Sequence, residues 1–112
     1  GDICLQFKES SPAAFKTTVK NVLKDAGYAF SNDCSVRLIA DVAAQEVPYN
    51  LGGMHKYDFT ISLKARDVLS GKQSDLFETV LTEVGMSENQ AFPLVLRDLK
   101  QELGEAVGDF SF

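Results

Sequence analysis

Side chains able to do chemistry are few and widely spaced in this 112-residue chain. His55 is the only histidine, and it stands beside the glycine pair Gly52 and Gly53. A histidine base needs a nucleophile within hydrogen-bond reach, and no spacing pairs His55 with a cysteine. One histidine and two separated cysteines also lack the spacing of a zinc site. The glycine pair lacks the rest of a phosphate-binding loop, so we interpret it as a turn. We therefore expect no catalytic residue, no metal site, no cofactor and no enzymatic activity.

The two cysteines, Cys4 and Cys34, leave two interpretations open. They could form one disulfide, which would indicate an oxidising compartment, or they could be two small half-buried side chains. A strand–helix–strand crossover makes its two strands parallel, which predicts both cysteines at the same end of the sheet. Cys34 alternates in step with the apolar residues of its predicted strand and Cys4 does not, so the two side chains could point to opposite faces.

Charged residues recur at helical spacing in two places. One predicted helix carries a lysine every four residues: Lys16, Lys20 and Lys24. Another carries carboxylates at intervals of four, three and four: Asp98, Glu102, Glu105 and Asp109. Each spacing places the charges on one side of a helix. Either stripe could be a solvated face, the two could meet across a helix pair, or the acidic one could be an edge that docks a basic partner.

Hydrophobic patterning predicts the elements that position these residues. Alternation predicts strands over about 2–8, 35–47, 56–66 and 74–84, and helical spacing predicts helices over about 12–26 and from about 87 to 107. The stretch 74–84 also fits a helix, but its β-branched residues and the need for a hairpin partner favour a strand. Pro93 predicts that the last helix begins late or bends. The predicted core is Leu5, Phe7, Phe15, Val19, Leu23, Leu38, Phe59, Ile61, Leu63, Leu96, Leu99 and Leu103.

Length and composition set the class of the protein. The chain is long enough for one domain over residues 1–112, and its net charge of −5 argues against binding nucleic acid. No apolar run approaches the roughly 20 residues that cross a bilayer. We predict an α+β fold with a four-stranded, mainly antiparallel sheet, two helices on one face, and the order β-α-β-β-β-α.

Several short motifs then point to a family. Ala26-Gly27-Tyr28 ends the first helix, Ser70-Gly71-Lys72 forms a turn, and Ser87 opens the last helix with Gln90. Over about residues 12–107 this pattern resembles small α+β domains of bacterial envelope lipoproteins, among them penicillin-binding-protein activators, flagellar-assembly lipoproteins and the lipopolysaccharide-assembly lipoprotein. The resemblance implies a module without catalytic residues that faces the periplasm and is tethered to the outer membrane. No lipobox is visible here, so a lipid anchor would lie upstream of Gly1.

Two functions follow from these observations. The first is a non-enzymatic interaction or assembly domain of a cell-envelope lipoprotein, with protein partners or envelope polymers in the periplasm. It would contact the membrane only through an upstream anchor. The alternative is a small-ligand-binding α+β domain that uses the sheet or the loop at residues 48–53. That alternative predicts a sizeable apolar pocket with a few converging polar groups.

Overall fold

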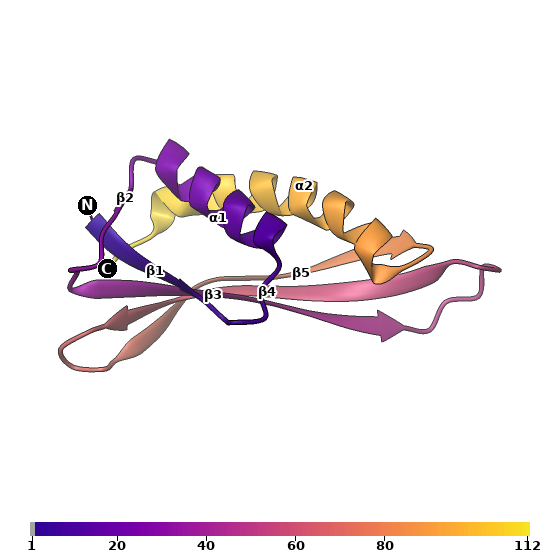
Figure 1. The fold of residues 1–112 in the computed structure, drawn as a ribbon, viewed down its shortest axis with the longest axis horizontal. Helices are drawn as coiled ribbons and strands as arrows, with labels where there is room; N and C mark the ends of the chain where they lie inside the picture. Colours follow the sequence, from indigo (N-terminus) through magenta and orange to yellow (C-terminus); the bar gives the residue numbers. More distant parts are fainter. Residues whose placement is uncertain (1) are drawn as a thin grey trace.

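A five-stranded sheet lies under a layer of two helices in the computed structural model, which describes residues 2–112 (Figure 1). The elements in chain order are β1 (Asp2–Phe7), α1 (Ala13–Asp25), β2 (Ala29–Phe30), β3 (Val36–Val47), β4 (His55–Asp67), β5 (Gln73–Gly85), α2 (Glu88–Ala106) and the short 3₁₀ helix η1 (Val107–Asp109). The α+β class is confirmed, with both helices on one face of the sheet.

The sheet has the strand order β2-β1-β3-β4-β5. β1 runs parallel to both of its neighbours, and β3, β4 and β5 pair antiparallel. The prediction of four strands was therefore one short, and the sheet is mixed. The missed strand, β2, has only two residues, which is too few for alternation to be visible in the sequence. The strand predicted over 74–84 is confirmed as β5.

The antiparallel part is a meander of long strands. β3 pairs with β4 from Val36 opposite Asp67 to Val47 opposite Lys56. The turn into β5 is closed by Asp67, whose Oδ1 accepts the backbone N–H of Leu69 at 3.0 Å and of Ser70 at 2.9 Å. These bonds, with burial opposing them, hold the pKa of Asp67 below its ordinary value. Gly71 supplies the positive φ of 74° that the turn requires.

The core lies between the inner face of the sheet and the two helices. Nine of the predicted core residues are buried there: Phe15, Val19, Leu23, Leu38, Phe59, Ile61, Leu63, Leu99 and Leu103. The other three are only half-buried against this cluster: Leu5, Phe7 and Leu96. Phe59 sits in the middle of β4, and its ring stacks on Phe92 of α2 with centroids 5.6 Å apart. Phe7 on β1 meets Phe15 on α1 edge-on at 5.8 Å.

α2 begins at Glu88 with Ser87 as its N-cap. The Ser87 hydroxyl accepts the backbone N–H of Gln90 at 3.1 Å, as the sequence pattern predicts. Gln90 reaches back to the N–H of Met86 with its side-chain oxygen. The helix does not begin late, since Pro93 lies inside it. Within residues 2–112, no helix combines the length and the apolar character that a membrane crossing needs.

Candidate functional site

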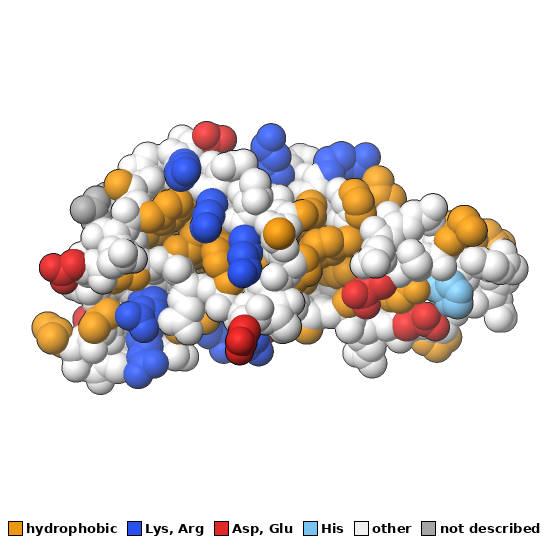
Figure 2. All heavy atoms as spheres, viewed as in Figure 1, with side chains coloured by type: hydrophobic (Ala, Val, Ile, Leu, Met, Phe, Trp, Pro, Cys, Tyr) orange, Lys and Arg blue, Asp and Glu red, His pale blue; other side chains and the backbone are white. Residues whose placement is uncertain are grey.

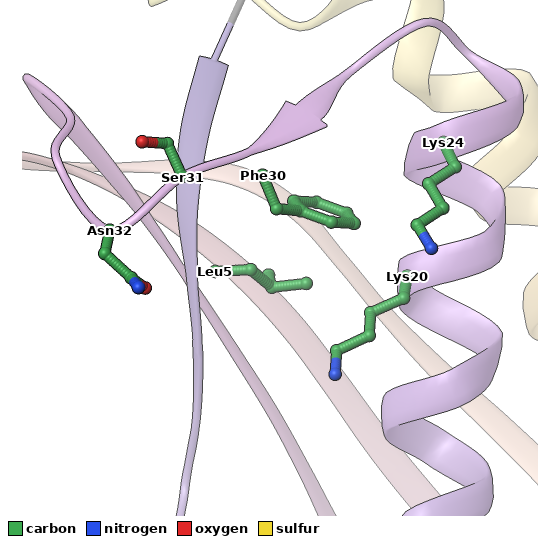
Figure 3. A pocket seen from close by; sticks show the side chains of 6 residues that line it. All are labelled: Leu5, Lys20, Lys24, Phe30, Ser31 and Asn32. Atoms are coloured by element: carbon green, nitrogen blue, oxygen red, sulfur yellow. The ribbon is translucent and has the colours of Figure 1, made fainter.

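A hollow of about 330 Å³ opens between α1 and the β1–β2 edge of the sheet. We call it the lysine groove, and Figure 3 shows the residues that line it: Leu5, Lys20, Lys24, Phe30, Ser31 and Asn32. The Leu5 side chain and the Phe30 ring lie next to each other and point toward α1. The two lysines extend from α1 toward them, whereas Ser31 and Asn32 lie across β1 from the helix.

The amphipathic pattern of α1 places the lysines at this rim. Phe15, Val19 and Leu23 are fully buried beneath the helix, so the positions between them face outward. Lys20 and Lys24 are exposed and Lys16 is half-buried. Figure 2 shows a row of basic side chains over the surface where Figure 1 draws α1, with apolar side chains exposed beside the row. The groove thus presents amines above an apolar floor.

Part of the β1 backbone at the floor of the groove has, among the described residues, no neighbouring strand on its outer side. The pairing of β2 with β1 ends at Ile3 opposite Phe30, and the Ile3 carbonyl accepts the N–H of Ser31 at 2.9 Å. Peptide groups two residues apart point to the same side of a strand, so those of Leu5 and Phe7 point the same way as that of Ile3. Within residues 2–112 no strand pairs with this outer side of Leu5 and Phe7. An unpaired edge of this kind can accept another strand.

A disulfide joins β1 to the segment that precedes β3. Cys4 of β1 is joined to Cys34, with Cα atoms 5.8 Å apart, so both cysteines lie at the same end of the sheet as predicted. The suggestion that their side chains point to opposite faces was wrong. Cys34 lies before β3 begins at Val36, in an irregular segment where strand alternation does not apply.

The acidic stripe occupies the other side of the molecule. α2 packs on β5, and the Glu102 carboxylate accepts a hydrogen bond from the Thr79 hydroxyl of β5 at 3.0 Å. One helical turn earlier, Asp98 faces Glu83 of β5. Burial, then the hydrogen bond to Asp98 and its charge, raise the pKa of Glu83, and the nearby Arg97 only partly opposes this. Glu105 and Asp109 continue the stripe as exposed residues.

The idea that the two stripes meet across the helix pair is therefore wrong. Lys20 and Lys24 line a groove with β1 and β2, whereas Glu102 binds β5, and these strands are at opposite ends of the sheet. The groove between the helices is lined instead by other side chains: Val22, Asp25, Ala26, Lys100, Gly104 and Val107. No ion pair joins the two stripes among residues 2–112.

His55 lies far from both stripes, at the start of β4. Its Nδ1 is 3.2 Å from a carboxylate oxygen of Glu46 on β3, and both side chains are exposed. Burial, followed by the charge of Glu46, raises the pKa of the neighbouring Tyr57 hydroxyl. An open hollow of about 470 Å³ lies beside the same hairpin tip.

Over residues 2–112, no group of three histidine, cysteine or acidic side chains lies close enough together to bind a metal ion.

Sequence reasoning found the lysines but missed the floor of the groove. Residues 28–33 read as a simple connection, although Tyr28, Ala29 and Phe30 are a short apolar run before three polar residues. That short run was the available signal. The partnership of Phe30 with Leu5 depends on β2 pairing parallel with β1, which two residues cannot reveal.

Comparisons with known proteins give the fold but no assigned function. No protein family matches the chain, and no curated protein does either. Several solved structures share its fold. A minor lipoprotein from Acinetobacter baumannii is 16% identical with a TM-score of 0.57, covering 93% of this chain and 87% of that one. A lipoprotein from Neisseria meningitidis is 10% identical with a TM-score of 0.55, covering 98% of this chain and 99% of the other.

A third solved structure belongs to the same class. The rare lipoprotein B from Shewanella oneidensis is 9% identical with a TM-score of 0.52, covering 94% of this chain and 83% of that protein. The fold is therefore one that small α+β domains of bacterial lipoproteins adopt. At these identities the likeness concerns the fold alone.

Proposed function

We propose that this chain is a non-enzymatic interaction domain of a bacterial envelope lipoprotein that faces the periplasm. The lysine groove is its docking surface. The observation that carries the proposal is the coincidence, at one place, of an unpaired strand edge at Leu5 and Phe7, an apolar floor, and the amines of Lys20 and Lys24. Such a surface fits an extended or acidic segment of a protein partner, because backbone pairing supplies affinity and charges supply specificity.

Two observations support the periplasmic setting. The disulfide between Cys4 and Cys34 suits an oxidising compartment, since disulfides are rare in the cytosol. The structures that share the fold include bacterial lipoproteins. Within that class, the sequence resemblance to penicillin-binding-protein activators and to flagellar- and lipopolysaccharide-assembly lipoproteins favours a role in assembling envelope machinery.

The alternative, a site for a small ligand, has weaker support. The hollow at the β3–β4 hairpin tip is large enough for one, but its lining comes from a single exposed hairpin. Ligand pockets bury most of their ligand's surface, and this hollow has no opposite wall from another element. The lysine groove joins two elements, yet its exposed lysines and open edge suit a macromolecule better.

Site-specific photo-crosslinking in the living bacterium tests the interaction domain. A photoreactive amino acid at Asn32, on the rim of the groove, should give discrete cross-linked protein products in the envelope. The same group at Thr60, which is exposed on the opposite face of the sheet, is the matched control. Lys20→Glu with Lys24→Glu should remove the products made at Asn32. Equal cross-linking at both positions, or none at Asn32, would reject the groove as a docking surface.

A further inference from the structure

The sheet ends in two open edges of opposite charge, both beneath the helical layer. At one end lie β2, the free part of β1, and the lysines of α1. At the other end lies β5, a strand of 13 residues that, within residues 2–112, pairs with β4 alone, together with the acidic stripe of α2. The carboxylates here outnumber the nearby cations, since in the described part of the chain Arg97 is the one cation beside Glu83 and Asp98.

We propose that copies of this chain associate head to tail, with the β5 edge of one copy joining the β1 edge of the next. The acidic stripe of α2 then lies against Lys16, Lys20 and Lys24 of the neighbouring α1. This inference rests on the proposed function and names a second copy as one partner of the lysine groove. Such a contact uses a different surface on each partner, so it forms rings or filaments and not closed twofold dimers.

The strand directions permit this arrangement. β1 is parallel to β3, and the two antiparallel steps from β3 to β4 and from β4 to β5 bring β5 back to the same direction. A translated copy therefore continues the sheet as a parallel pair. Because both helices lie on one face, the same translation brings α2 of one copy beside α1 of the next (Figure 1).

The lengths of the two stripes also match. At 1.5 Å per residue, Lys16 to Lys24 spans about 12 Å of α1, and Asp98 to Asp109 spans about 16 Å of α2 and the turn that follows it. Three amines thus face four carboxylates over a similar distance. The contact would bring further cations to Glu83 and Asp98, whose charges Arg97 offsets only in part within one copy.

Charge also disfavours the symmetric alternatives. A twofold contact between two β5 edges would bring two acidic stripes together, and one between two β1 edges would bring two lysine rows together. Like charges facing each other across an interface cost free energy, whereas opposite charges select a partner and an orientation. The charge pattern therefore favours only the contact between unlike edges.

Sedimentation velocity of the purified chain over a range of concentrations tests the proposal. We expect self-association at low salt that weakens as salt is added, because added salt shortens the range of exposed charges. Lys20→Glu with Lys24→Glu should weaken the association at least about tenfold, and Glu105→Lys with Asp109→Lys should do the same. Of these four side chains, Glu105 accepts one long hydrogen bond, from the exposed Gln101 amide at 3.5 Å. Circular dichroism will check that both variants remain folded.

The decisive step is to mix the two variants. In each variant one edge keeps its charge and the other loses or reverses its own, so each alone should remain monomeric. An equimolar mixture can pair the unchanged acidic stripe of one variant with the unchanged lysine row of the other, so it should associate again. Lys64→Glu with Arg66→Glu makes the same change in net charge as the lysine variant, but on the exposed outer face of β4, and should leave association unchanged.

Three results would overturn the head-to-tail contact. They are a wild-type chain that stays monomeric at low salt, association that the outer-face control abolishes equally, and a mixture that fails to associate. If the wild type stays monomeric while Asn32 still cross-links another envelope protein in cells, self-association is wrong and the interaction domain stands. If neither assay gives a product, both proposals fail.

Discussion

The two edge regions of the sheet differ in the features that limit pairing with strands of other molecules. At the β1–β2 end the strands are short, a disulfide ties β1 to the segment that leads into β3, and lysines stand over an apolar floor. At the β5 end the strand is long and carries no disulfide, and one carboxylate of α2, that of Glu102, accepts a hydrogen bond from Thr79 of the strand. Short strands and charged neighbours both discourage uncontrolled pairing of edges. The comparison shows that each edge lies beside side chains of mainly one charge, lysines at the β1–β2 end and carboxylates at the β5 end.

Both edges depend on the core that holds α1 and α2 on one face of the sheet, with α1 toward the β1–β2 edge and α2 toward the β5 edge. Phe59 is 1% exposed at the centre of β4 and stacks on Phe92. Phe59→Ala should lower the free energy of unfolding by about 3–5 kcal/mol, because it removes a large buried side chain and leaves a cavity. Urea denaturation measures the change. The neighbouring Thr60→Ala, on the exposed face, should cost less than about 0.5 kcal/mol. A cost below about 1 kcal/mol for Phe59→Ala would mean that the core is wrongly placed.

The second-largest effect is expected from breaking the disulfide, which is present at the β1 end of the sheet and absent at the β5 strand. Cys4 and Cys34 are 30 residues apart in sequence, and a cross-link of that span typically stabilises a fold by about 2–4 kcal/mol. Cys4→Ser with Cys34→Ser should lower stability by that amount and make it insensitive to reductant. A thiol titration of the denatured, unreduced wild type should find no free thiol. Two free thiols would refute the bond.

A smaller effect is expected at the acidic edge. Thr79→Val keeps the shape of the side chain but removes the hydroxyl that donates to Glu102, and it should cost about 1 kcal/mol in unfolding free energy. Thr79→Ser keeps the donor and is the matched control. If both variants are equally stable, the bond contributes nothing and the stripe is held by packing alone.

The smallest expected effect is a gain in stability. The pKa of Glu83 is raised in the folded protein, so ionising its carboxyl disfavours folding. This penalty is absent at pH below the ordinary glutamate pKa, grows as pH rises from the ordinary to the raised pKa, and is constant above it. Glu83→Gln should therefore raise the urea midpoint at about pH 7.5 and leave it nearly unchanged at about pH 4. Glu78→Gln, exposed on the outer face of the same strand, is the control. A loss of stability at neutral pH would contradict the shift.

Hydrophobic patterning predicted the long strands and helices. It missed the short strand β2 and the position of α1 over the β1 edge, because both depend on contacts between distant segments. Alternation over Tyr57 to Ala65 and the helical spacing of Phe15, Val19 and Leu23 are local signals, and the structure confirms both. β2 is invisible because its two residues are a strand only through their pairing with β1. The lysine spacing placed three charges on one side of α1. It could not reveal that this side faces the β1 edge and not α2, since that depends on which helix lies over which strand.

The position of β1 at the start of the chain has a kinetic consequence. β3, β4 and β5 are consecutive and joined by hairpin turns, so their pairings close only short loops. β1 instead pairs with β3 across α1 and β2, with Leu5 opposite Leu38, and must close a much longer loop. Closing longer loops costs more chain entropy, so we expect the meander to form first in folding and β1 to add afterwards. The lysine groove would then be the last surface to be completed, and substitutions at Leu5 should speed unfolding more than they slow folding.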